Sequence, residues 1–201
     1  MQTLVTLLLL LTVFAPPVYQ ATMPKENAEE LEIWRYGDSF AAVYVPAVRA
    51  SSTLKPGRTG RYEVKHLQDR DLATAWVEGA KGNGTGEWLE FTFDRTKKDS
   101  DSGRTDVAVD GLLLFNGYRK SPTLWRENGR VRRMRLSVNG TSYGVLELKD
   151  TRTWQRVRFP KVPLPPNQKT VFRLTIDAVY PGSKYPDTAL TEVEWEGVGV
   201  F

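Results

Sequence analysis

RRMRLSVNGTSYGVLEL, residues 132–148, carries the pattern from which the fold class follows. Every second residue from Met134 to Val138 is apolar, and the residues between them are arginine or serine. This period of two is that of a β-strand with one buried face. The dipeptide Asn139-Gly140 comes next and favours a tight hairpin turn with positive φ angles. Leu146 and Leu148 then continue the alternation, so the stretch predicts two antiparallel strands.

Similar patterns recur on both sides of this hairpin. The further strands that we expect lie at Val43–Ala47, Trp88–Phe93, Val107–Phe115, Val157–Phe159, Phe172–Ala178 and Ala189–Trp195. Together they make about eight or nine short strands with turn residues between them, and no long helix is expected after residue 40. The sequence therefore predicts an all-β fold, an antiparallel β-sandwich of the jelly-roll kind.

Composition narrows the function classes. The 201 residues suffice for one domain with a sizeable core. Lys and Arg number 28 against 24 Asp and Glu, a mild excess that permits anionic partners without selecting one. The chain has no cysteine, which excludes disulfides, thiolate metal sites and cysteine catalysis. It has one histidine, His66.

The N-terminal segment is typical of an exported protein. Residues 3–15 are apolar and uncharged, are too short to span a membrane comfortably, and precede Pro16-Pro17. We expect a signal peptide over residues 1–21, cleaved near Gln20 or Ala21, and hence secretion or a periplasmic location. The alternative is a buried N-terminal strand or helix. Residues 22–40 then form a lead-in, and residues 41–201 form the domain.

The segment HLQDRDLATAWVEGAKGNGTGEW, residues 66–88, has neither a helical nor a strand period. Such a polar, glycine-rich stretch is typical of a loop that holds an ion or borders a ligand. The spacing of Asp69, Asp71 and Thr74 allows oxygens to converge on a hard cation. The same aspartates could equally do no more than cap the turn, and the spacing alone does not distinguish the two.

Several motifs, in order, resemble the discoidin family (coagulation factor 5/8 type C domains). They are ASST (50–53), LQDRD (67–71), TAW (74–76) and LTEV (190–193). A second set is similar to a sub-branch, the glycan-binding translocation domain of a streptococcal NAD glycohydrolase toxin. That set is TAWVEG (74–79), GNGTGEW (82–88), NGYRKS (116–121), Asn128 with Arg130, and VYPGSKYPDTALTE (179–192). The resemblance spans about residues 41–197.

This resemblance implies a galactose-binding-like fold that binds carbohydrate and contains a structural calcium ion. The implied calcium ligands are Asp69, Asp71, Thr74, backbone oxygens near Leu67, and Glu192. One residue departs from the pattern, because Arg70 stands where the wider family often has glycine. We therefore expect the turn after Asp69 to be a point of difference.

Sugar sites combine an aromatic platform with converging polar groups. The candidates in the motif segments are Trp76, Glu78, Asn116, Tyr118, Lys120, Trp125, Arg126, Asn128 and Arg130. Each also has a structural interpretation. Trp76 could belong to the core, Asn116 to a turn, and Asn128 with Arg130 to the support of a loop.

The function that we expect is a non-catalytic module that binds a glycan or glycoconjugate on a cell surface. The alternative is an adhesion module for anionic glycan or phospholipid, using arginines on one sheet face, namely Arg130, Arg132, Arg133, Arg135, Arg156, Arg158 and Arg173. Paired carboxylates such as Glu192 with Glu194, or Glu87 with Glu90, are required by glycosidases, but no enzyme-sized cleft accompanies them, so we expect no catalysis. No nucleic-acid partner is expected, and the sequence predicts no oligomeric state.

Overall fold

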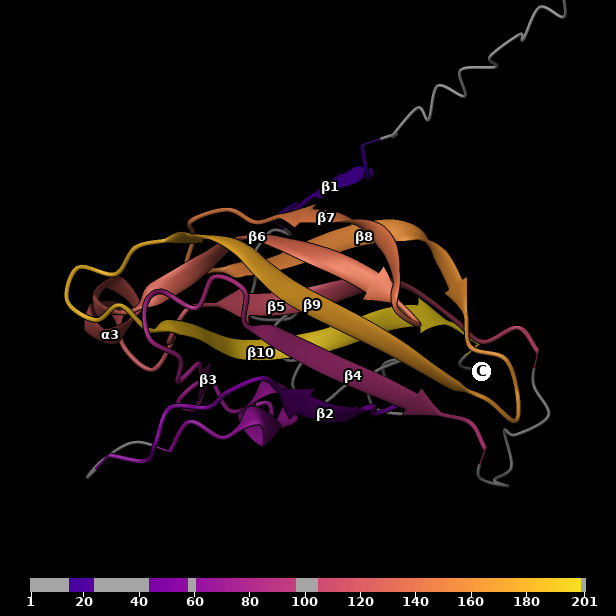
Figure 1. The fold of residues 1–201 in the computed structure, drawn as a ribbon, viewed down its shortest axis with the longest axis horizontal. Helices are drawn as coiled ribbons and strands as arrows, with labels where there is room; N and C mark the ends of the chain where they lie inside the picture. The colour runs from indigo at the N-terminus through magenta and orange to yellow at the C-terminus, as the bar shows by residue number, and fades with distance from the viewer. Residues whose placement is uncertain (1–14, 24–43, 58–60, 97–104, 200–201) are drawn as a thin grey trace, which may run out of the picture.

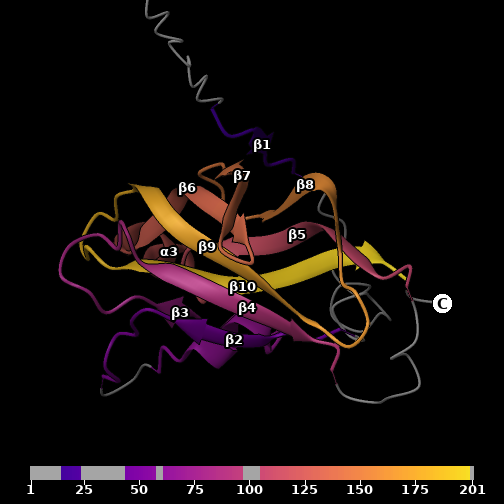
Figure 2. The same cartoon turned by 45° about the vertical axis from the view of Figure 1, so that its right-hand side comes forward.

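Two packed β-sheets make up the fold in the computed structural model, which describes residues 15–23, 44–57, 61–96 and 105–199. One sheet holds β2 (Ala47–Ala50), β4 (Trp88–Asp94), β9 (Lys169–Tyr180), β6 (Gly129–Val138) and β7 (Thr141–Glu147). The other holds β10 (Thr188–Val198), β5 (Ala108–Asn116) and β8 (Trp154–Pro163). Short pieces complete it: β1 (Val18–Gln20), β3 (Trp76–Val77), the 3-10 helix η1 (Val64–Gln68) and α3 (Pro122–Glu127) (Figures 1 and 2).

Neighbouring strands within each sheet run antiparallel. The sheets meet where β10 starts beside the start of β6, through a short parallel pairing of Thr188-Ala189 with Gly129-Arg130. The all-β sandwich predicted from the sequence is therefore confirmed. Among the described residues, no helix has the length and apolar character needed to cross a membrane.

Aromatic side chains fill the space between the sheets. Trp195 of β10 is 1% exposed, and its ring centroid lies 5.2 Å from that of Phe91 on β4 and 4.7 Å from that of Phe172 on β9. Edge-on and tilted aromatic pairs at these separations stabilise a core beyond the area that they bury. The apolar face of each predicted strand is thus the face that points into the sandwich.

Local details confirm some expectations and correct others. Asn139 and Gly140 adopt φ angles of 49° and 81°, as the hairpin between β6 and β7 requires. The strand predicted at Val43–Ala47 is wrong in its bounds, since β2 begins at Ala47. Pro46 has no N–H to donate to a ladder, which explains the later start. Residues 24–40 of the expected lead-in lie outside the described residues.

Strand β1 joins the two sheets along one side. It pairs in parallel with β7, and the Ala21 amide donates to the Glu147 carbonyl at 2.9 Å. The Thr22 amide donates to the Arg156 carbonyl of β8 at 2.8 Å. Ala21 is 3% exposed. The last residues of the predicted signal peptide therefore form a partly buried strand, which is the alternative that the sequence left open. Residues 1–14 lie outside the described part of the chain.

Tyr19 is the side chain that anchors β1. Its ring centroid lies 6.0 Å from that of Phe159 and 6.5 Å from that of Tyr143. We expect Tyr19→Ala to lower the free energy of unfolding by about 2–3 kcal/mol, as removal of a packed aromatic ring does. Urea unfolding of the chain from Ala15 onward measures this change. Val18→Ala is the matched control, because Val18 is 52% exposed on the same strand; equal effects of the two substitutions would contradict the packing of β1.

Candidate functional site

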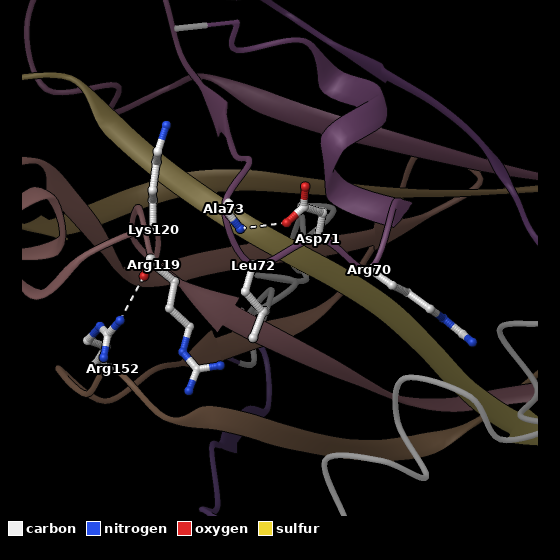
Figure 3. Close-up of a pocket in the computed structure, with 7 residues that line it drawn as sticks. All are labelled: Arg70, Asp71, Leu72, Ala73, Arg119, Lys120 and Arg152. Atoms are coloured by element: carbon white, nitrogen blue, oxygen red, sulfur yellow. Dashed lines mark hydrogen bonds between the residues drawn. The ribbon is translucent and has the colours of Figure 1, made fainter. Parts of the chain in front are cut away.

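A pocket rich in cationic side chains lies where three loops meet, and we call it the basic pocket. Its volume is about 490 Å³. Residues 70–73, which follow η1, line one wall; Arg119 and Lys120, which follow β5, line another; and Arg152 comes from the connection between β7 and β8. Figure 3 shows these side chains. The lining residues are Arg70, Asp71, Leu72, Ala73, Arg119, Lys120 and Arg152.

The first wall is shaped by two aspartates that cap consecutive turns. Asp69 Oδ1 accepts from the Asp71 amide at 3.0 Å, and Asp71 Oδ1 accepts from the Ala73 amide at 2.9 Å. Arg70, between them, has a φ of 56°, which is the left-handed conformation that glycine adopts most easily. The turn therefore keeps the shape that glycine would favour. The Arg70 side chain turns aside (Figure 3) and pairs with Glu194 at 2.8 Å.

The second wall contains two arginines. The Arg119 guanidinium lies 4.4 Å from the centroid of the Phe115 ring, a cation–π geometry. Arg152 donates from Nη2 to the Arg119 carbonyl at 2.8 Å (Figure 3). The backbone at Arg119 is held by β10, because the Arg119 amide donates to Thr191 Oγ1 at 3.0 Å. These contacts hold the cationic groups at the pocket instead of leaving them free to sample solvent.

An apolar surface underlies the pocket. Leu72 packs against a small cluster formed by Leu113 and Phe115 of β5 and Trp154 of β8. This cluster is separate from the main core between the sheets. The basic pocket therefore offers an apolar contact from Leu72 beside its cationic groups, which is the mixed character of small-ligand sites.

The arginines of the strands differ from those of the pocket, because carboxylates neutralise them. Six of the seven arginines expected to form a basic sheet face have an acidic partner. The pairs are Arg130–Asp150, Arg133–Glu147, Arg135–Asp177, Arg156–Glu196, Arg158–Asp110 and Arg173–Glu90. Ion pairs thus neutralise most of the positive charge that these arginines would place on the sheet surface.

Lys120 and Arg152 lack such compensation. In the described ranges, neither side chain has an acidic group within ion-pair distance. Arg152 Nε is also buried and has no hydrogen-bond partner there. A buried donor without an acceptor costs free energy unless something binds to it. The basic pocket therefore contains two cationic side chains whose charge no neighbouring carboxylate neutralises in the described ranges.

A buried carboxylate lies on the inner side of the loop that forms the first wall. Glu192 on β10 is 1% exposed, and neither of its carboxylate oxygens has a hydrogen-bond partner of good geometry among the described residues, although the Asp69 carboxyl group and the Arg70 amide lie close to it. Burial, together with the nearby charges of Asp69 and Glu194, raises the pKa of Glu192 to about 9. Asp69 Oδ2 lies 2.7 Å from His66 Nδ1 and 2.9 Å from Thr74 Oγ1.

This arrangement supplies part of the oxygen ligand set that a hard cation requires. Two neighbouring carboxylates, one of them buried without a partner, gain from a positive ion that replaces the missing donors. The described residues contain no cluster of three or more Asp, Glu, His or Cys side chains able to hold a metal ion. Any cation would therefore need the hydroxyl of Thr74 and backbone carbonyls to complete its coordination. Asp71 uses one carboxylate oxygen to cap its own turn.

A model of a known protein family matches most of the chain. The model of the NAD glycohydrolase translocation F5/8 type C domain matches residues 39–196. The chain belongs to this family. The discoidin resemblance noted in the sequence is thereby confirmed. No curated protein matches the chain in sequence.

Solved structures resemble this F5/8 type C domain in fold. The CBM32-1 and CBM32-2 domains of Clostridium perfringens ZmpB match with a TM-score of 0.54 at 13% identity, over 92% of this chain and 43% of theirs. The same pair in complex with GalNAc matches with a TM-score of 0.54 at 14% identity, over 91% and 40%. A longer form that includes the M60 catalytic domain gives 0.58 at 12% identity, over 92% and 17%. The chain thus spans less than half the length of these structures.

Within this F5/8 type C domain, most of the sequence-predicted sugar ligands lie in the interior. Six of the nine have at most 7% of their surface exposed: Trp76, Glu78, Asn116, Tyr118, Asn128 and Arg130. Buried side chains cannot form a platform for a sugar, so the structure does not support their placement at a ligand surface. Their contacts show what they do instead.

Asn116 and Arg130 support the backbone. Asn116 Nδ2 donates to the Val131 carbonyl at 2.7 Å, and Asn116 Oδ1 accepts from the Val131 backbone amide at 2.9 Å. Arg130 donates to the carbonyls of Asn128 and Pro181 at 2.9 and 3.2 Å, besides pairing with Asp150. These motif residues satisfy buried backbone groups that would otherwise lack partners.

Trp76 and Glu78 fix the first loops to the sandwich. Trp76 Nε1 donates to the Ser52 carbonyl at 3.0 Å. The Glu78 carboxylate accepts from the Ala80 amide at 2.8 Å and from the Thr188 amide at 3.2 Å. Both side chains hold segments that are distant in sequence, which is a structural role.

The glycine-rich stretch after them is attached to strands of both sheets, and its Asn83 also lines a second pocket beside residues 181–186. Gly82, Gly84 and Gly86 all have positive φ angles, between 77° and 114°. The Gly86 amide donates to the Ile176 carbonyl at 2.8 Å, and Thr188 Oγ1 donates to the Asn83 carbonyl at 2.9 Å. The stretch therefore attaches to β9 and β10 and needs glycine for its backbone path.

Three predicted residues remain accessible. Lys120 lines the basic pocket, and Arg126 is exposed on α3. Trp125 is half-buried; its Nε1 donates to the Asn116 carbonyl at 2.9 Å, and its ring lies 4.7 Å from the Arg130 guanidinium. The sequence did not point to Arg70, Leu72, Arg119 or Arg152. Two of these four residues lie within motifs that the sequence singled out, Arg70 in LQDRD and Arg119 in NGYRKS. Leu72 and Arg152 have no such indication in the sequence.

Proposed function

We propose that the chain is an exported, non-catalytic glycan-binding module of the discoidin type, with the basic pocket as its binding site. The pocket itself is the observation that carries this proposal. It combines hydrogen-bond donors on fixed side chains with the apolar contact of Leu72, in a volume of about 490 Å³ that suits a small saccharide. The F5/8 type C family and the fold of the carbohydrate-binding modules support the same class.

The acidic residues support a non-catalytic role. Glu194 pairs with Arg70, and Glu90 pairs with Arg49 and Arg173. Glu192 is buried beneath the loop. A glycosidase needs two carboxyl groups that face the scissile bond, and these carboxylates face other protein groups.

A structural calcium ion is part of the proposal. Asp69, Thr74 and Glu192 would hold it, with backbone oxygens of the loop from Leu67 to Asp71 as further ligands. The unpartnered carboxylate of Glu192 supports this assignment. A bound divalent ion would neutralise the buried carboxylates and fix the loop whose outer side lines the basic pocket.

Export is proposed together with a revised cleavage position. Processing at Gln20 or Ala21 would remove β1, which pairs with β7 and packs Tyr19 on Phe159. We therefore place the cleavage upstream of Val18. The partner proposed for the exported module is a glycan or glycoconjugate on a cell surface.

A glycan array tests the proposed function. We expect the purified chain to bind a defined set of saccharides, and we expect a chelator to weaken binding because the loop that lines the pocket loses its cation. Assays for glycosidase and NAD glycohydrolase turnover serve as the control and should show none. Turnover in either assay, or an array with no bound saccharide, would overturn the glycan-binding assignment.

A further inference from the structure

We infer that the basic pocket selects acidic saccharides, which present a carboxylate or sulfate group to Arg152, while Lys120 adds positive charge at the other end of the pocket (Figure 3). This inference rests on the proposed function and adds the class of ligand. The sugar ring would lie against Leu72, and its anionic group would face the second wall. Neutral saccharides would leave the cationic groups of the pocket without a counter-charge.

The first support is the distribution of charge. Six arginines on the strands have carboxylate partners, whereas Arg152 and Lys120 have none in the described part of the chain. Asp71 is the only acidic residue among those that line the pocket, and its Oδ1 already accepts from the Ala73 amide. A ligand that enters therefore meets more cationic than anionic side chains, and the attraction falls as the salt concentration rises.

The second support is the state of Arg152. Its Nη2 is used in a bond to the Arg119 carbonyl at 2.8 Å, which fixes the guanidinium plane. Its Nε is buried and has no acceptor among the described residues. A guanidinium fixed in this way keeps its positive charge at the pocket and loses less entropy when an oxyanion binds. An oxyanion in the pocket would meet this charge from the side of the guanidinium that these two nitrogens do not occupy.

The third support distinguishes a saccharide from a free ion or a lipid surface. The pocket holds about 490 Å³, far more than one inorganic anion occupies, and Leu72 gives it an apolar wall. A membrane surface would instead require positive charge spread over an exposed face. The strand arginines do not provide such a face, because they are paired.

Calorimetric titration with matched saccharides tests the inference. The probes are lactose against 3′-sialyllactose, and N-acetyllactosamine against its 6-sulfated form, with sodium sulfate as the free anion. We expect at least one acidic probe to bind roughly tenfold tighter than its neutral counterpart, as one charge-assisted contact allows. Arg152→Gln should remove about that factor for the acidic probe and leave the neutral probe unchanged.

Two further variants control for folding and charge. Arg152→Lys keeps the charge but not the paired donors, so it should recover part of the affinity. Arg126→Gln removes one positive charge from the exposed face of α3, outside the pocket, and should change nothing. Thermal unfolding of each variant shows that it is folded before titration.

The outcomes separate the two proposals. The acidic-ligand inference is overturned if the acidic and the neutral saccharide of each pair bind equally well. It is also overturned if Arg152→Gln is folded and keeps full selectivity. In both cases the glycan-binding function stands. Binding of sulfate ion without any saccharide, or no binding at all, would overturn both. Preference for only the carboxylate or only the sulfate probe would support the inference and identify the source of the anion.

Discussion

Replacing Arg130 with alanine is expected to lower the free energy of unfolding by about 2–3 kcal/mol, because two backbone carbonyls near the buried guanidinium lose their donor. Arg130 is 7% exposed and pairs with Asp150 at 2.9 Å. Its guanidinium also donates to two backbone carbonyls and lies over the ring of Trp125. The substitution removes all of these contacts and leaves the carbonyls without their donor. Urea unfolding followed by intrinsic fluorescence measures the loss.

Arg126→Ala is the matched control for this experiment. Arg126 is exposed at the end of α3, so its removal should change the stability by no more than about 0.5 kcal/mol. The pair of variants also separates the two roles that the sequence left open for Arg130. A variant Arg130→Ala with unchanged stability but lost saccharide binding would show that Arg130 contacts the ligand, contrary to the structural role.

Stability is expected to depend on calcium and on pH through Glu192. The pKa of Glu192 in the folded chain is raised to about 9 by burial and by the nearby negative charges of Asp69 and Glu194. Glu194 is itself paired with Arg70. The folded state therefore binds more protons than the unfolded state at pH values between about 4.5 and 9. Without a cation, the contribution of Glu192 to stability is present below pH 4.5 and is lost progressively as pH rises through 9. A bound calcium ion reverses this loss, because it favours the ionised carboxylate.

Thermal and urea unfolding at pH 5, 7 and 8.5, with calcium or with chelator, check this expectation. Calcium at about one hundred times its Kd should stabilise the chain by about 2.7 kcal/mol. Glu192→Gln, in which no charge has to be buried, should be insensitive to calcium and should lack the Glu192 part of the pH dependence. The difference between wild type and this variant removes the contribution of other titrating groups. The calcium proposal fails if neither chelation nor Asp69→Ala changes the stability of the chain.

The sheets were predictable from the sequence because their signal is local. Alternation at Met134–Val138 and at Phe172–Ala178 requires only the period of two and a buried face, and both segments lie in strands. The turn at Asn139-Gly140 carries its own conformational preference. Helix α3 was not expected, since six residues are too few for a helical period, and its start depends on a Ser121 cap with Pro122 behind it.

The candidate site was not predictable in the same way, because the role of a polar residue depends on partners distant in sequence. Asn116 resembles a ligand-binding amide until Val131 is placed beside it. Glu78 resembles an exposed acid until the Thr188 amide reaches it. The same limit applies to the basic pocket. Arg152 lies in a turn with no motif, and only the fold brings it next to the carbonyl of Arg119.

The assignment of the basic pocket as the glycan site is best tested by a crystal structure of the chain with the saccharide that binds most tightly in the array. We expect the sugar to occupy the basic pocket, with a polar group on Arg152 or Lys120 and its ring against Leu72. A sugar bound instead at the β9–β10 loop, near Tyr185 and Pro186, would contradict the assignment of the site.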